Sequence, residues 1–248
     1  MMTLEERAAV LSATQKTVGG KLPFMVGCGA IDPNIVVSYC HQAIEYGATA
    51  ALIATPYYVK PTPLGLVRHY SHVAAAVPDL PIILYNVPGR TGVDMTASTA
   101  ARITAACPPG SIIGCKEATG EVSRVAHYRE KLGPDFLLWG GDDAAGAEFV
   151  LGGGDGVISV TANVAPRAMR AVMDAAREGN RELTTSLNAP LMDLHNDIFI
   201  QPNPIPCKHA LWRMGMIENG VRTPLHPLEE EHWEVLERAM GKAGIELI

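Results

Sequence analysis

Lys116 is the residue of this sequence best placed for covalent chemistry. It closes the apolar run Ile112–Lys116 and is followed by Glu117 and a short polar loop. In proteins built from alternating strands and helices, catalytic groups lie where strands end and loops begin. An amine at the end of a buried strand is desolvated, which lowers its pKa and leaves more of it neutral. A neutral amine can attack a keto carbonyl and form an iminium, so we predict that Lys116 is a Schiff-base nucleophile.

The other lysines have different settings. Predicted helix faces carry Lys16, Lys131 and Lys242, and predicted loops carry Lys21 and Lys60. Lys208 lies at the start of a predicted helix. The alternative for Lys116 is a buried lysine that is permanently paired with a carboxylate of the same sheet. The residues at the ends of the neighbouring strands favour the catalytic interpretation.

Two tyrosines follow the strand-like runs that precede Lys116. Tyr58 ends the segment Thr-Pro-Tyr-Tyr, and Tyr85 closes the next run along the chain. A phenol at such a place can carry protons to and from an imine intermediate. One tyrosine alone is usually a packing residue, but three consecutive strands that end in Tyr58, Tyr85 and Lys116 are hard to attribute to packing. Arg90 lies in the loop after Tyr85, where a guanidinium can bind a carboxylate with two parallel hydrogen bonds.

These residues require a parallel α/β framework. Short apolar runs recur at a spacing of roughly 25–35 residues, the repeat length of βα units. Because the runs are apolar almost throughout, they are typical of strands buried on both faces. The predicted strands are Phe24–Cys28, Ala51–Thr55, Ile82–Tyr85, Ile112–Lys116, Phe136–Trp139 and Val157–Val160.

Capping residues predict where helices begin and end. Thr3 with Glu6 forms a capping box, and Asp32 before Pro33 is a helix N-cap. After the last predicted strand the pattern is helical only, with helices predicted at Pro166–Glu178, Arg181–Ile198, Pro206–Met214 and Leu228–Lys242. We therefore expect a barrel region over residues 1–178 and a C-terminal helical region over residues 179–248.

The predicted fold class is α/β, a (β/α)8 TIM barrel with a C-terminal helical extension. Such a barrel has eight strands, and the sequence offers six, so the first two strands are expected to be missing. An open doubly wound sheet is the alternative, because it accommodates six strands. No Gly-x-Gly-x-x-Gly segment follows a predicted strand to support that alternative.

Composition narrows the functional class. The net charge of −6 and the scattered lysines argue against a nucleic-acid-binding surface. No apolar run reaches the roughly 18–20 residues that a membrane span requires, and the acidic start does not resemble a signal peptide, so a cytoplasmic protein is expected. The five cysteines form no Cys-x-x-Cys pair, which predicts free, mostly buried thiols.

Five segments together resemble the dihydrodipicolinate synthase family, within the N-acetylneuraminate lyase superfamily. They are Thr-Pro-Tyr-Tyr, Leu-Tyr-Asn-Val-Pro-x-Arg-Thr-Gly, Gly-x-Lys-Glu-Ala-Thr-Gly, Gly-Asp-Asp-Ala and Gly-Val-Ile-Ser-Val-Thr-Ala-Asn. Their order and spacing are similar to those of the family over nearly the whole chain. The resemblance implies a Schiff-base lyase of lysine and diaminopimelate biosynthesis that condenses pyruvate with aspartate semialdehyde, without cofactor or metal. It also implies a homotetramer built as a dimer of dimers.

The resemblance further implies roles for individual residues. Lys116 would form the Schiff base with pyruvate, Tyr85 would relay protons, and Tyr58 would extend that relay from the neighbouring subunit. Arg90 would hold the carboxylate of aspartate semialdehyde. The backbone carbonyl of Ile158 would line the pocket, and Gly141 would lie near the second substrate.

Two alternatives of function stay open. The first is another pyruvate-dependent class I aldolase of the superfamily, acting on a keto-deoxy-sugar acid or on sialic acid. The sialic acid lyases typically lack an arginine where this chain has Arg90, which favours a small acidic aldehyde. The second is an inactive chain with a structural or regulatory role.

The sequence departs from the family at its start. Members carry two further strands and a Gly-Thr-Thr-Gly-Glu-Ser motif before the segment that Met2–Glu6 matches, and the threonines of that motif bind the pyruvate carboxylate. We expect a truncated or misassigned start. If the protein really is this short, little or no synthase activity is expected.

His69 and His72 lie three residues apart on a predicted helix and could form half of a metal site. No third ligand lies at a suitable spacing. A solvated helix face is therefore the expected setting of both imidazoles.

We predict that lysine inhibits this protein weakly or not at all. In the family it resembles, lysine-inhibited members use histidines in the first helix present here, and an asparagine and a glutamate just after the next strand. This chain has Glu6 and Ala9 in that helix, and Ile31 and Ile35 after the strand. The rate of pyruvate turnover should stay unchanged when lysine is added. Inhibition at sub-millimolar lysine would contradict this prediction.

Overall fold

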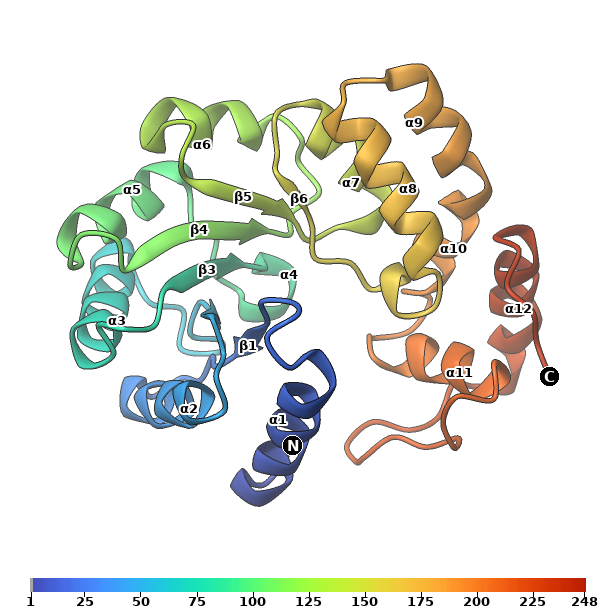
Figure 1. Ribbon diagram of the computed structural model, residues 1–248, viewed down its shortest axis with the longest axis horizontal. Coiled ribbons are helices and arrows are strands. Elements are labelled where there is room, and N and C mark those ends of the chain that lie inside the picture. Colours follow the sequence, from blue (N-terminus) through green and yellow to red (C-terminus); the bar gives the residue numbers. More distant parts are fainter. Residues whose placement is uncertain (1) are drawn as a thin grey trace. The chain divides into compact units, whose positions relative to one another are not determined.

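The computed structural model describes residues 2–248 and contains a parallel β-sheet whose strands alternate with helices (Figure 1). All six predicted strands are present, and they follow one another in the sheet in sequence order. The strands are β1 (Met25–Gly27), β2 (Ala50–Ala54), β3 (Ile82–Asn86), β4 (Ile112–Glu117), β5 (Leu137–Gly140) and β6 (Gly156–Val157).

The sequential strand order distinguishes between the two predicted architectures. In a doubly wound sheet the order reverses at one point, and helices cover both faces. Here each crossover moves in the same direction, and right-handed crossovers then place the connecting helices on one face. Figure 1 shows these helices along one side of the first strands: α2 (Pro33–Glu45), α3 (Pro63–Ala76), α5 (Ala97–Ala106) and α6 (Arg124–Leu132). The fold is therefore of the TIM-like α/β type, with six parallel strands.

The chain divides into two compact units, residues 1–139 and 140–248. The boundary falls inside β5, and the amide of Ile158, just after β6, donates to the carbonyl of Gly140 within the second unit (2.8 Å). The predicted division between residues 178 and 179 stays a prediction.

The first two helices of the first unit begin at side chains that cap them. The Thr3 hydroxyl accepts from the amide of Glu6 at 3.1 Å, and the Glu6 carboxylate accepts from the amide of Thr3 at 2.8 Å, so the predicted capping box is confirmed. Asp32 caps α2 by accepting from the amide of Asn34 at 2.8 Å, which is also as predicted. These helices are α1 (Leu4–Val18), α2 (Pro33–Glu45), α3 (Pro63–Ala76), α4 (Pro88–Thr91), α5 (Ala97–Ala106) and α6 (Arg124–Leu132).

The second unit is mainly helical, and its buried apolar side chains form one cluster that includes Met169, Val172, Leu194 and Leu236. Three 3-10 turns connect its helices, at Thr161–Asn163, Ala189–Leu191 and Glu230–His232. The α-helices are α7 (Asp143–Leu151), α8 (Pro166–Arg177), α9 (Arg181–Asn188), α10 (Met192–Asp197), α11 (Ile205–Arg213) and α12 (Trp233–Lys242).

Two predicted elements of the second unit have different bounds in the structure. The helix predicted over Arg181–Ile198 is interrupted by a 3-10 turn around Pro190, because proline lacks the amide that a continuous helix needs. The last predicted strand ends early, at Val157. The Asp143 carboxylate accepts from the amides of Val160 and Thr161, at 2.9 Å each, and holds that segment in a turn.

All five cysteines are free and buried, as predicted. Among residues 2–248, no helix combines the length and the apolar character of a membrane span.

Gly114, two residues before Lys116 in β4, allows β4 and β5 to approach closely. A Cβ atom at this position would clash with the carbonyl oxygen of Leu137 and would lie 2.9 Å from the Trp139 ring. We predict that Gly114→Ala lowers the free energy of unfolding by about 1–3 kcal/mol, the usual cost of overpacking. Gly27→Ala in β1 is the matched control, because nothing lies within 4 Å of its added methyl group. Urea denaturation measures both, and equal midpoints would show the prediction to be wrong.

Candidate active site

Lys116 and Tyr85 lie side by side at the carboxyl ends of β4 and β3. The two residues are register partners in this parallel pair. The Lys116 Nζ atom lies 4.4 Å from the centroid of the Tyr85 ring. Both side chains are half-buried. Because register partners on adjacent strands project from the same face of a sheet, the strand pairing itself places the amine against the phenol.

Arg90 lies next to this pair, in the last turn of α4. Burial raises the pKa of Tyr85, and the positive charge of Arg90 partly opposes that rise. The phenol therefore keeps its proton at neutral pH and can donate it. Arg90 itself is an exposed residue. The structure thus places Lys116 against Tyr85, with Arg90 close enough to Tyr85 to influence it electrostatically.

Two threonines that the sequence analysis did not single out join the ends of this region. The Thr55 hydroxyl, at the end of β2, donates to the Thr91 hydroxyl of α4 at 3.0 Å. Both side chains are buried. The amide of Thr55 also donates to the carbonyl of Tyr85 at 3.1 Å. The two threonines stand in the segments that carry Tyr58 and Arg90. Thr55 directly follows β2, and that place is the signal that could have identified it, whereas Thr91 is the last residue of α4.

Tyr58 has a different setting from the other predicted site residues. Its side chain is 87% exposed, so the fold of one chain does not bury its phenol with Tyr85 and Lys116. Its backbone is in the left-handed region, with φ +67°, and Lys60 has φ +46°. Such conformations cost about 1–3 kcal/mol each in residues other than glycine and gather at functional sites. The backbone of this loop therefore projects a tyrosine into solvent.

Ile158 and Gly141 belong to the second unit. Gly141 directly follows Gly140, whose carbonyl accepts from the amide of Ile158 at 2.8 Å. Gly141 and Ile158 therefore lie beside each other, Gly141 at the carboxyl end of β5 and Ile158 at that of β6. Asp142, the next residue, caps α7 by accepting from the amide of Ala145 at 2.8 Å. Asp142 thus has the helix-capping role typical of an aspartate at this position.

The prediction that His69 and His72 both lie on a solvated helix face is wrong for His69. Its side chain is buried, with its ring edge-on to Tyr70 at 5.3 Å between centroids. Burial lowers the pKa of His69 to about 4, so the imidazole is neutral. The ring of His72 instead shares a hydrogen bond with the Asn34 side chain at 3.2 Å. The two histidines differ in burial because only His69 faces the elements against which α3 packs.

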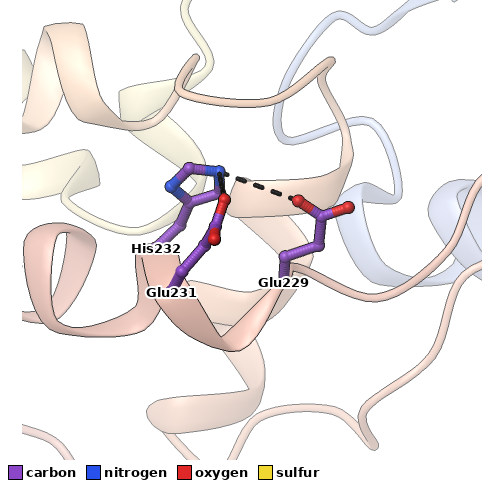
Figure 2. Close-up of side chains that lie close together, drawn as sticks. All are labelled: Glu229, Glu231 and His232. Carbon is purple, nitrogen blue, oxygen red and sulfur yellow. Dashed lines mark ion pairs between the residues drawn. The ribbon is translucent and has the colours of Figure 1, made fainter.

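One cluster of possible metal ligands occurs among residues 2–248, and Figure 2 shows it in the second unit. The His232 Nε2 atom lies 3.9 Å from a Glu229 oxygen and 3.6 Å from a Glu231 oxygen. The two glutamates are exposed and reach the imidazole from within one short turn. Ion pairing among these three side chains accounts for the cluster.

Comparison with known proteins connects this geometry to a family. Residues 1–243 match the model of the dihydrodipicolinate synthetase family. A 4-hydroxy-tetrahydrodipicolinate synthase of Shewanella sp. (strain ANA-3) is 47% identical over 99% of this chain and 83% of its own length. The synthase of Methylococcus capsulatus is 47% identical over 97% of this chain and 81% of its own length.

Solved structures agree with this assignment. The dihydrodipicolinate synthase of Acinetobacter baumannii, crystallised with pyruvate, aligns with a TM-score of 0.95 at 42% identity, covering 99% of this chain and 83% of that one. The synthase of Thermotoga maritima aligns with a TM-score of 0.92 at 38% identity, covering 98% and 82% respectively. With the lysine, the tyrosine and the arginine in the positions described above, this chain belongs to the dihydrodipicolinate synthetase family.

Proposed function

We propose that this chain condenses pyruvate with aspartate semialdehyde, as a 4-hydroxy-tetrahydrodipicolinate synthase of lysine and diaminopimelate biosynthesis. The observation that carries the proposal is the contact of Lys116 Nζ with the face of the Tyr85 ring, 4.4 Å from its centroid. The names of the relatives support it, as does the pyruvate in the Acinetobacter baumannii structure.

The chemistry follows from an amine and a phenol side by side. The neutral amine of Lys116 attacks the keto carbon of pyruvate, and the resulting carbinolamine loses water to form an iminium. Loss of a proton from the methyl group gives an enamine, whose terminal carbon then attacks the aldehyde carbon of aspartate semialdehyde. Tyr85 donates a proton to the leaving hydroxide and takes part in the later transfers, because its phenol is protonated at neutral pH.

Arg90 recognises the second substrate in this proposal. Its guanidinium lies close enough to influence Tyr85 electrostatically and can bind the carboxylate of aspartate semialdehyde. Ile158 would line the pocket with its carbonyl, and Gly141 would lie near the second substrate. Their adjacent places at the ends of β5 and β6 support these roles.

A second copy of this chain supplies Tyr58 in this proposal. The side chain of Tyr58 is exposed and its backbone is left-handed. Both features support this role, because they direct the phenol away from its own subunit. A homotetramer arranged as a dimer of dimers is the assembly we propose, in the cytoplasm. The sequential parallel strand order supports a closed eight-stranded barrel as the complete fold, with a C-terminal helical region after residue 178.

Covalent trapping tests the central proposal. Incubation with pyruvate and borohydride should reduce an iminium on Lys116, which peptide mass spectrometry locates. Lys116→Arg should abolish the adduct, because a guanidinium is not a nucleophile at neutral pH. Absence of an adduct on the unmodified chain would refute the proposal and leave the inactive structural or regulatory role.

Arg90→Ala tests the choice of aldehyde. A hydrogen bond to a charged group contributes about 1.5–3 kcal/mol. Its loss should therefore lower kcat/KM for aspartate semialdehyde roughly 10- to 150-fold. Trapping of pyruvate alone should change little. Arg68→Ala on α3 controls for loss of a positive charge. An equal effect on uncharged aldehydes would contradict the prediction and favour another aldolase of the superfamily.

Mixing two inactive variants tests whether Tyr58 acts in a neighbouring subunit. Tyr58→Phe and Lys116→Ala should each have low activity alone. In a mixed dimer, one site combines an intact Lys116 with an intact Tyr58 from the partner subunit, so activity should recover. Refolding the two together and measuring turnover reveals this. If the mixture shows only the sum of the separate activities, Tyr58 does not act across an interface.

A further inference from the structure

A buried polar pair lies directly behind the candidate catalytic residues. Asn86 follows Tyr85 in β3, and Glu117 follows Lys116 in β4. The side chains of Asn86 and Glu117 are 0% and 1% exposed. Because successive side chains of a strand alternate between the faces of a sheet, this pair projects away from the amine and the phenol.

Both the nitrogen and the oxygen of the Asn86 side-chain amide are hydrogen-bonded. Its Nδ2 donates to Glu117 Oε2 at 3.0 Å and to Asp94 Oδ1 at 2.9 Å. Its Oδ1 accepts from the amide of Met95 at 2.8 Å. The three partners determine which way the amide points, so the nitrogen must face Glu117.

Glu117 is a buried carboxylate whose charge is compensated from several elements. Its Oε1 accepts from the amide of Thr119 at 2.8 Å. The Tyr128 hydroxyl of α6, which shares its hydrogen with the Met95 carbonyl at 3.1 Å, lies 3.4 Å from Oε2, and the Arg124 guanidinium lies 3.8 Å away. A buried carboxylate with this number of partners has a well-defined position, whereas loss of one partner leaves polar atoms unsatisfied.

The pairing of β3 with β4 is irregular at its start and therefore needs a constraint at its end. Ile82 pairs with Ile112, but Ile83 pairs with Gly114, so Ile113 is an extra residue in β4. A bulge of this kind shifts the register by one residue. A shift of one residue turns every following side chain to the opposite face. Beyond the bulge, Asn86 and Glu117 are register partners and bond to each other.

We propose that the hydrogen bond between Asn86 and Glu117 is the register lock that holds Lys116 against Tyr85. Both are positioning residues that act through the neighbouring residue of their own strand. The inference rests on the proposed function for its catalytic meaning, since the held geometry is that of the Schiff-base nucleophile and its proton donor. Misplacement of a reacting group by about 1 Å can cost on the order of 100-fold in rate.

Two nearly isosteric substitutions break this bond. In Glu117→Gln, a second side-chain amide replaces the carboxylate. Its nitrogen must then face another N–H donor, which is either the Asn86 side chain or the backbone amide of Thr119. In Asn86→Asp, a third carboxylate faces those of Glu117 and Asp94. The double variant N86D/E117Q restores a donor opposite an acceptor between residues 86 and 117, with the polarity reversed and the same total charge, while residue 86 still faces the Asp94 carboxylate.

The first readout is the rate at which pyruvate is trapped on Lys116 by borohydride. We expect each single variant to trap at least tenfold more slowly than the unmodified chain, within the range that misplacement of a nucleophile produces. The double variant should recover at least half of that loss on a logarithmic scale. Tyr70→Phe is the matched control, because it removes a buried hydroxyl bonded to the Ile53 carbonyl (2.9 Å) elsewhere in the same unit. It should lower stability without slowing trapping.

The second readout needs no pyruvate and therefore separates this inference from the proposed function. Reaction with trinitrobenzenesulfonate, followed by peptide mass spectrometry, gives the labelling rate of Lys116 relative to that of Lys60 and Lys131. The ratio should change several-fold in both single variants and return toward the original value in the double variant. If the unmodified chain traps no pyruvate, the proposed function is refuted. The labelling ratio of Lys116 then still tests whether the Asn86–Glu117 bond holds the register.

Three outcomes would overturn the inference. The first is a Lys116 labelling ratio that is the same in every variant. The second is a trapping rate that merely follows the melting temperature across all variants, with Tyr70→Phe included. The third is a double variant that is no better than the worse single one. Should Asn86→Asp fail to fold, Glu117→Asp replaces it, since it keeps the charge but shortens the reach toward Asn86.

Discussion

The geometry of the candidate site depends on the register in which β3 pairs with β4. That register makes Tyr85 and Lys116 neighbours on one face of the sheet and Asn86 and Glu117 neighbours on the other. One face therefore carries the reactive amine and its phenol, and the other carries a hydrogen-bonded polar pair. Since the side chains of a strand alternate with a period of two, neither pair can be displaced without the other.

Burial and charge then determine the chemistry that this arrangement supports. The partly buried phenol of Tyr85 retains its proton, because burial raises its pKa more than the charge of Arg90 lowers it. Arg90 stays exposed on α4, whose last turn is tied to the end of β2 through the bond between Thr91 and Thr55. The site thus combines a rigid interior of strand ends with an exposed arginine at its margin, a suitable arrangement for a small acidic substrate.

Much of this could be predicted from local sequence patterns. Apolar runs identified all six strands, and Thr3 and Asp32 marked helix starts, because these features depend on residues close together in the chain. The early end of β6 could not be predicted, since it depends on the Asp143 carboxylate from a helix earlier in the chain. The burial of His69 likewise follows from packing between elements, which helical periodicity alone does not reveal.

The sequence alone determined which residues could react and that Tyr85 and Lys116 lie near the ends of strands, because residue type and strand periodicity are local properties. Only the tertiary structure decided which of them meet. It placed Lys116 Nζ 4.4 Å from the centroid of the Tyr85 ring and left Tyr58 exposed to solvent. The physical reason is that strand register and loop conformation arise from contacts between distant segments. A buried pair such as Asn86 and Glu117 can therefore constrain a site that neither residue touches.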